Sequence, residues 1–181
     1  MKVIAFGDSL TVGYQTPFEA TPYVSFLARL VGPGATFTIA AVSGETTADM
    51  LRRFDRDVLK DAPDRVIVLG GANDIGWGRG TDEIMDHLSA MYRRALDAKI
   101  LPVACAIPSI LGADDLVPPR IALNRRIQKE AERWGVPYVD LFAATADRSG
   151  RLRPEYSYDG LHLTAEGYRK IAETLYDAVF K

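Results

Sequence analysis

The sequence has little cysteine and histidine and no strong excess of charge of either sign. Its 181 residues include one cysteine and two histidines, and 22 Lys and Arg residues stand against 24 Asp and Glu residues. A single cysteine excludes an internal disulfide and a cysteine-rich metal site. A formal net charge of −2 argues against nucleic acid or an anionic membrane as the main partner, because both select basic surfaces.

Long hydrophobic runs are also missing. No apolar run approaches the roughly 20 residues that a helix needs to cross a bilayer, so we expect no stable membrane insertion. The apolar stretch at positions 3–6 is too short for a secretory signal, which favours a cytoplasmic protein, although a signal removed from the sequence as given stays open. A length of 181 residues predicts a single domain over 1–181.

Several catalytic and nucleotide-binding motifs are absent. The sequence has no Gly-x-Ser-x-Gly elbow, no P-loop, no Gly-x-Gly-x-x-Gly after its first strand and no His-Glu-x-x-His. Cys105 lies in the apolar run 101–107, where an inert core thiol is a better interpretation than a reactive one.

What the sequence does contain is an alternation of apolar runs and helical patterns. The apolar runs, which are typical of strands buried on both faces, are 2–6, 36–42, 65–69, 100–106 and 136–140. The first helical pattern follows a cap at Thr21, with Pro22 at the first helical position. The others begin at Thr46 or Thr47, at Thr81, near Pro119 and at Thr164. Five such units predict an α/β fold with a parallel sheet, and we expect the flavodoxin-like strand order 2-1-3-4-5.

In such a sheet, ligands bind at the carboxyl ends of the strands near the switch point between strands 1 and 3. The predicted strands 1, 2 and 3 are followed by Gly-Asp-Ser-Leu at 7–10, Ser-Gly-Glu-Thr at 43–46 and Gly-Gly-Ala-Asn-Asp at 70–74. A long irregular segment at 141–163 follows strand 5 and is long enough to return across this edge. We therefore expect the chemistry in these loops.

Ser9 is the candidate nucleophile, because it stands at the abrupt end of the first strand. A serine needs a base, and His162 stands three residues after Asp159, which could orient the imidazole. The alternative is that Asp159-Gly160 forms an ordinary turn beside the cap at Thr164. The other histidine, His87, is expected on the surface of its helix.

Three groups are candidate donors to a developing oxyanion: the Ser9 N–H, the Gly44 N–H and the Asn73 amide. Asn73 could instead be a turn or cap residue. Trp77 could wall an acyl pocket or be a half-buried loop aromatic, and 110–119 could be a mobile rim or an ordinary loop.

Four blocks of this sequence together resemble the SGNH, or GDSL-type, hydrolases. They are Gly7-Asp8-Ser9-Leu10, Gly44, Gly71-Ala72-Asn73-Asp74 and Asp159-Gly160-Leu161-His162-Leu163. The stretch 42–47 resembles a bacterial branch of small esterases, thioesterases and lysophospholipases. Where many relatives of that branch carry an asparagine before this glycine, the chain has Ile39-Ala40-Ala41. This departure removes one source of hydrogen bonds around Gly44.

The resemblance implies a three-layer α/β/α fold and a serine esterase without metal or cofactor. It implies Ser9 as nucleophile, His162 as base and Asp159 as the orienting residue. It further implies an oxyanion hole formed by the Ser9 N–H, the Gly44 N–H and Asn73, with Asp8 and Asp74 supporting the loops.

We therefore expect hydrolysis of a small acyl ester or thioester through a Ser9 acyl-enzyme. Alternatives are a carbohydrate O-deacetylase with the same mechanism and a non-catalytic flavodoxin-like module that binds a small anion. A metal-dependent phosphoesterase is a further alternative if Asp8, Asp74, Asp159 and His162 cluster. The sequence carries no signal for a particular oligomeric state.

Overall fold

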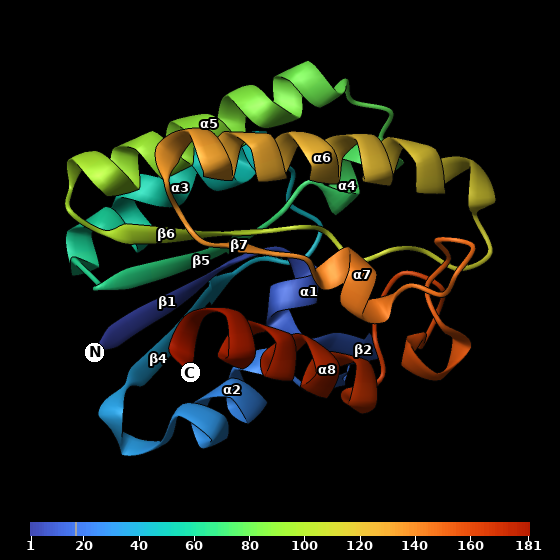
Figure 1. Ribbon diagram of the computed structural model, residues 1–181, viewed down its shortest axis with the longest axis horizontal. Coiled ribbons are helices and arrows are strands. Elements are labelled where there is room, and N and C mark those ends of the chain that lie inside the picture. Colours follow the sequence, from blue (N-terminus) through green and yellow to red (C-terminus); the bar gives the residue numbers. More distant parts are fainter. Residues whose placement is uncertain (17) are drawn as a thin grey trace.

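The computed structural model describes residues 1–16 and 18–181 and contains a central sheet of five parallel strands (Figure 1). The strand order is β4-β1-β5-β6-β7, which confirms the order 2-1-3-4-5. The strands are β1 (Lys2–Gly7), β4 (Thr36–Ala41), β5 (Arg65–Leu69), β6 (Leu101–Cys105) and β7 (Tyr138–Val139). β7 is shorter than expected, because this edge strand pairs on one side only and its ladder with β6 joins only two residue pairs.

Helices cover both faces of the sheet, so the fold is three-layered (Figure 1). The helices on one face are α3 (Thr47–Asp57), α5 (Thr81–Asp97) and α6 (Val117–Trp134). The helices on the other face are α1 (Ser9–Val12), α2 (Tyr23–Val31) and α8 (Ala165–Leu175). The three-layer α/β/α architecture is thereby confirmed.

The ends of these helices follow from local chemistry. Thr46 caps α3 in a capping box with Asp49, and Thr164 caps α8 by accepting from the Gly167 N–H. Gly135 ends α6 in the left-handed conformation. The cap expected at Thr21 is wrong: α2 begins one residue later, with Pro22 at the cap position, because proline already has the extended backbone that a cap needs.

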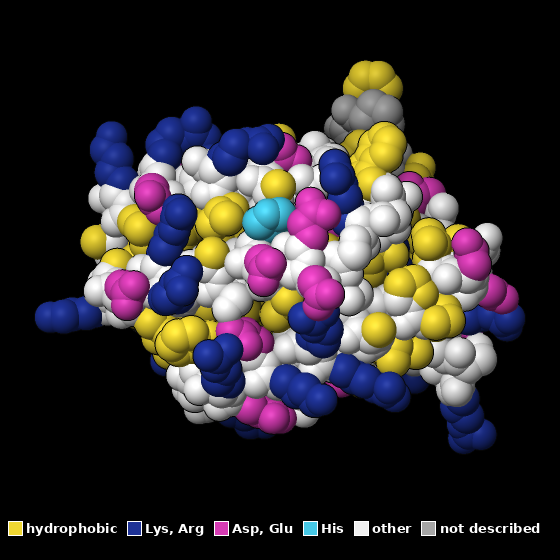
Figure 2. Space-filling model, turned by 90° about the horizontal axis from the view of Figure 1, so that it is seen from above, with side chains coloured by type: hydrophobic (Ala, Val, Ile, Leu, Met, Phe, Trp, Pro, Cys, Tyr) yellow, Lys and Arg dark blue, Asp and Glu magenta, His cyan; other side chains and the backbone are white. Residues whose placement is uncertain are grey.

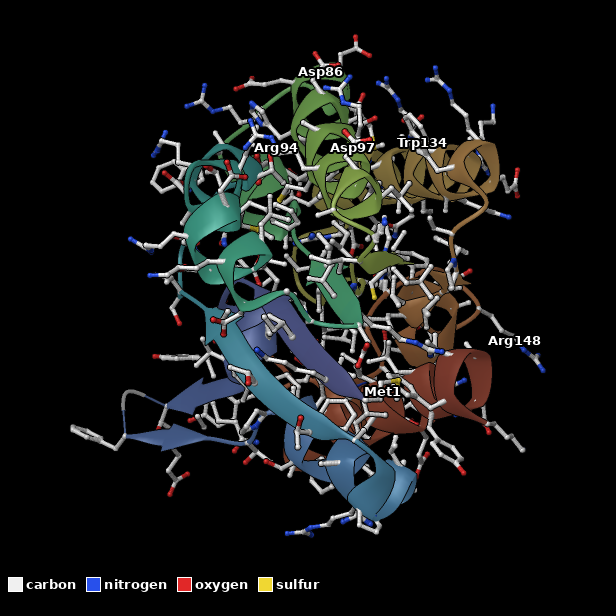
Figure 3. The ribbon with its side chains drawn as sticks, turned by 90° about the vertical axis from the view of Figure 1, so that its left-hand side faces the viewer. Met1, Asp86, Arg94, Asp97, Trp134 and Arg148 are labelled. Atoms are coloured by element: carbon white, nitrogen blue, oxygen red, sulfur yellow. The ribbon has the colours of Figure 1, made fainter. Side chains whose placement is uncertain are left out.

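The sequence analysis did not predict several shorter elements. Two are the helices α4 (Ala72–Gly76) and α7 (Leu141–Thr145). Two more, β2 (Tyr14–Thr16) and β3 (Glu19–Ala20), pair as a hairpin that projects from the body of the molecule (Figure 3). The remaining helical turns are η1 (Gly32–Gly34), η2 (Leu59–Asp61), η3 (Asp114–Leu116), η4 (Pro154–Tyr156) and the π-helical η5 (Tyr176–Phe180).

The core lies between the sheet and its helical layers. Residues Val3 to Phe6 of β1 are fully buried, as expected of a central strand covered on both faces. Cys105 is also buried, and burial raises the pKa of its thiol, so an inert core thiol is the correct interpretation. Positive and negative side chains are interspersed on the face that carries α5 and α6 (Figure 2). Among the described residues, no helix combines the length and apolar character needed to span a membrane.

Candidate active site

Ser9 lies at the carboxyl end of the central strand β1, at the first position of α1. Gly7 is the last residue of β1, and a Cβ atom there would lie 2.3 Å from the Thr11 hydroxyl oxygen and 2.4 Å from the Leu69 carbonyl oxygen. Only glycine fits such a close approach. Asp8 then caps α1 by accepting from the Leu10 N–H, and Ser9 is held with 6% of its surface exposed.

Three side chains from two distant parts of the sequence meet here in a continuous hydrogen-bonded chain. The Ser9 Oγ lies 3.0 Å from the His162 Nε2, and the His162 Nδ1 lies 2.7 Å from the Asp159 Oδ2. The long segment after β7 thus returns to the end of β1, as its length predicted. The bonded Asp159 fixes the tautomer in which Nε2 can accept a proton.

The loop that carries Asp159 and His162 is held on several sides. Asp159 accepts from the backbone N–H groups of Leu161 and His162, and the Tyr158 N–H donates to the His162 carbonyl. The Gly160 carbonyl accepts from the Leu111 N–H at 2.8 Å, which ties this loop to the segment after β6. The Tyr14 ring of the hairpin packs against the His162 ring with centroids 4.6 Å apart. The imidazole is therefore placed by contacts as well as by Asp159.

The charge of Asp159 is favoured by its surroundings. Partial burial raises the pKa of this carboxyl, but the hydrogen bonds from the His162 ring and from the His162 and Leu161 backbone outweigh it, so the pKa lies below its usual value. Asp159 is therefore an ionised acceptor for the imidazole at neutral pH.

Gly44 and Asn73 lie on the neighbouring loops. Gly44 is exposed with a φ of +82°, and no atom lies within 4 Å of where its Cβ would be, so a ligand can approach its backbone. The Asn73 Nδ2 donates to the Glu45 carbonyl at 2.8 Å and lies 3.5 Å from the Asp8 Oδ2. Asn73 thus joins the loop after β5 to the loop after β4 with one amide hydrogen and makes a longer hydrogen bond to Asp8 with the other.

Asp8 and Asp74 are both buried beneath these loops. Burial raises the pKa of Asp8 to about 7, opposed by the Leu10 N–H and by the charge of Arg120. Asp74 accepts from the Thr47 N–H at 2.9 Å and from its hydroxyl at 2.6 Å, which fixes the start of α3.

His87 does not lie on the surface as expected. It is half-buried, and its Nδ1 lies 3.0 Å from the Thr47 hydroxyl, so it extends the network of Asp74. A histidine that follows an acidic residue on a charged helix gives no sequence signal for such a contact.

Arg53 on α3 was missed by the sequence analysis. Its buried guanidinium donates to the Gly7 carbonyl at 3.0 Å and to the Ala40 carbonyl at 3.1 Å, and it pairs with Glu45 at 2.7 Å and Asp57 at 3.1 Å. These bonds hold the loop of Gly44 against β1. The sequence signal for its burial was that Arg53 follows Met50 by three residues, which places both on the same buried face of the helix.

A cavity of about 280 Å³ opens beside Asn73. Trp77 forms its rim with 76% of its surface exposed, while Arg120 of α6 is buried. The segment 110–119 also contributes to the wall, through Ile110 and Leu116. In residues 1–16 and 18–181, no group of three or more His, Cys, Asp or Glu side chains has an arrangement that could hold a metal ion.

Known proteins resemble this chain in both sequence and structure. Residues 5–170 match the sequence profile of the GDSL-like Lipase/Acylhydrolase family. An arylesterase from Vibrio mimicus is 28% identical over 183 residues, which cover 95% of this chain and 84% of the relative.

Solved structures establish the same fold at low sequence identity. A GDSL-like lipase from Bacteroides thetaiotaomicron superposes with a TM-score of 0.83 and 23% identity, covering 98% of this chain and 86% of its own. An acetylxylan esterase from Geobacillus stearothermophilus superposes with a TM-score of 0.85 and 20% identity, and the match covers 99% of this chain and 94% of the esterase. Catalytic mutants of that esterase replace a serine, a histidine or an aspartate.

Proposed function

The chain belongs to the GDSL-like lipase/acylhydrolase family and is a carboxylic ester hydrolase, and from this premise we propose that it cleaves esters or thioesters through an acyl-enzyme on Ser9. The observation that carries the proposal is the chain of contacts from the Ser9 Oγ through His162 to Asp159. The serine, histidine and aspartate that catalytic mutants of the acetylxylan esterase lack support the same three roles.

In the first half of the reaction, the His162 Nε2 takes the proton of the Ser9 hydroxyl while its oxygen attacks the carbonyl carbon. Asp159 stabilises the imidazolium that forms. The carbonyl oxygen becomes an oxyanion, which accepts from the Ser9 N–H, the Gly44 N–H and an Asn73 amide hydrogen that gives up its long contact with the Asp8 Oδ2. The C–O or C–S bond then breaks, and His162 gives its proton to the leaving alcohol or thiol.

In the second half, water replaces the leaving group. His162 takes a proton from this water, which attacks the acyl carbon, and the resulting intermediate expels Ser9 with the proton returned to its oxygen. Asp8 and Asp74 support these steps without touching substrate, because Asp8 caps the helix of Ser9 and Asp74 anchors the start of α3.

The test is a comparison of Ser9→Ala with Ser25→Ala on p-nitrophenyl acetate. Ser25 is an exposed serine of α2 and serves as the matched control. Loss of turnover and of fluorophosphonate labelling only in Ser9→Ala is expected, and wild-type turnover in Ser9→Ala would contradict the proposal. Asp159→Asn should fold normally and lose roughly 10³–10⁴-fold in kcat, because the imidazole then adopts the wrong tautomer.

A second candidate is removal of acetyl groups from carbohydrates by the same mechanism. The exposed ring of Trp77 beside the cavity favours it, because a flat aromatic surface suits the apolar face of a sugar ring. Preferential hydrolysis of an acetylated xylo-oligosaccharide over p-nitrophenyl acetate would identify this activity, and the reverse preference would exclude it as the main one.

A further inference from the structure

Arg120 is a buried arginine whose charge no described residue neutralises directly. It lies in the first turns of α6 with 1% of its surface exposed. Its Nε and Nη1 atoms are buried and have no hydrogen-bond partner among the described residues. Burying a polar group without a partner is costly, and burying a charge is costlier still. A binding partner for this guanidinium is therefore to be sought outside the chain.

The guanidinium keeps its charge at neutral pH. Burial lowers the pKa of Arg120 to about 10, and the nearby Asp8 carboxyl opposes the change. Asp8 is no substitute for a direct partner, because its Oδ1 accepts from the Leu10 N–H and its Oδ2 faces the Asn73 amide. Arg120 forms no ion pair of 4.0 Å or less within the described chain.

The cavity beside Asn73 gives a ligand access to Arg120. Apart from these two side chains, its walls are small or apolar, and the large members are Trp77, Ile110, Leu116 and Leu161. Leu161 precedes His162 in the chain, and Asn73 is a proposed donor to the oxyanion. A molecule in this cavity therefore lies next to the reacting carbonyl, with a carbon chain against apolar walls.

We propose that Arg120 is a specificity residue that binds a carboxylate carried by the ester substrate. The Arg120 guanidinium is a charged donor beside the cavity, and a carboxylate there would neutralise its charge and accept a hydrogen bond from it. The carboxylate can stand on the acyl part or on the alcohol part of the ester, and both place the same anion in the cavity. The inference rests on the proposed function, since it names the substrates that the Ser9 site prefers.

The experiment measures kcat/KM for a carboxylate-bearing ester relative to a neutral one. For the acyl part, p-nitrophenyl hemiglutarate is compared with p-nitrophenyl butyrate. For the alcohol part, 4-acetoxybenzoate is compared with its methyl ester. In Arg120→Met, the ratio should fall at least about tenfold in one of these pairs, because a hydrogen bond to a charged group is lost.

Two further variants separate recognition from general charge or packing effects. Arg120→Lys keeps the charge and should recover part of the ratio. Arg125→Met removes an exposed arginine of the same helix and should leave the ratio unchanged. A ratio that is the same in wild type and Arg120→Met for both pairs would overturn the inference.

Failure of the proposed function has a different signature. In that case the wild type shows no Ser9-dependent hydrolysis of the neutral esters. The anion site is then tested without turnover, by calorimetric titration of wild type, Arg120→Met and Arg120→Lys with glutarate. Binding that is weakened at least about tenfold in Arg120→Met supports the site, and equal binding by all three proteins overturns it.

Discussion

Two arginines are buried on the same side of the sheet, and their surroundings differ completely. Arg53 on α3 donates to two carbonyl groups and pairs with two carboxylates. Arg120 on α6 has two buried nitrogens without a partner in the described part of the chain and lies against a cavity. The first arginine joins the loops of Ser9 and Gly44, whereas the second leaves its donors unused beside Asn73.

The difference teaches how to distinguish a structural cation from one that binds a ligand. A buried charge with satisfied donors belongs to the folded framework. Removing it leaves its buried partners without a donor, which lowers the free energy of unfolding. A buried charge with unused donors weakens the folded protein until something binds it. Burial alone does not separate the two cases, but hydrogen-bond satisfaction does.

The largest effect is expected for Arg53→Met. Two carboxylates and two carbonyl groups each lose a donor, so the free energy of unfolding should fall by about 3 kcal/mol. In a chain of this size, that corresponds to a melting temperature roughly 6–12 °C lower. Arg52→Met is the matched control, since Arg52 is exposed and pairs with Asp49 on the helix surface. Equal melting temperatures for the two variants would remove Arg53 from the framework.

The next effect is a change of stability with pH that depends on Asp8, whose pKa is lowered by the charge of Arg120. Its folded pKa of about 7 lies above the unfolded value of about 3.9, so its contribution to stability is complete below about pH 4 and is lost as the pH rises through about 7. Wild type should therefore lose stability relative to Asp8→Asn over this interval. Arg120→Met should shift the loss to higher pH, because Arg120 lowers this pKa.

Urea unfolding at pH values between about 4 and about 8 measures this difference. The Asp8→Asn substitution keeps an acceptor oxygen that can cap α1, which makes this variant the appropriate comparison. A stability difference between wild type and Asp8→Asn that does not change with pH would contradict the raised pKa.

A smaller effect on stability is expected for Arg120→Met, in contrast to Arg53→Met. The methionine keeps most of the apolar stem and removes a charge that no described residue satisfies, so stability should stay within about 1 kcal/mol of wild type or increase. Thermal denaturation of Arg53→Met and Arg120→Met side by side gives the comparison. A loss as large as that of Arg53→Met would mean that Arg120 also belongs to the framework.

The smallest effect is expected for Trp77→Ala at the rim of the same cavity. The ring is mostly exposed, so the free energy of unfolding should change by less than about 0.5 kcal/mol. KM for aromatic or glycosidic esters should rise a few-fold, with kcat little changed, if the ring contacts substrate equally in the ground and transition states. An unchanged KM across these substrates would show that the ring is not part of the pocket.

The layers of the fold were predictable because the physics of its main elements is local. Strands such as 65–69 are apolar throughout, and loops such as 7–10 combine glycine with small polar residues. These patterns placed Ser9, Gly44 and Asn73 at one edge of the sheet. The position of His162 depended on the 141–163 segment returning, which its length allowed.

The two arginines were not predicted, because arginine on a helix normally indicates an exposed face. Each nevertheless stands within a buried stripe, Arg53 next to Phe54 and Arg120 three residues before Leu123. The hairpin of Tyr14 was missed since its strands are too short to show alternation. Contacts between such distant side chains depend on the assembled fold.

The hydrogen bond from the Leu111 N–H to the Gly160 carbonyl has a consequence for changing this protein. Ile110 and Leu116 of the segment after β6 line the cavity, while residue 160 belongs to the turn between Asp159 and His162. Exchanging either loop alone for one from a relative would disturb the other. An engineer who wants a new substrate range should therefore exchange the two loops together, from the same relative.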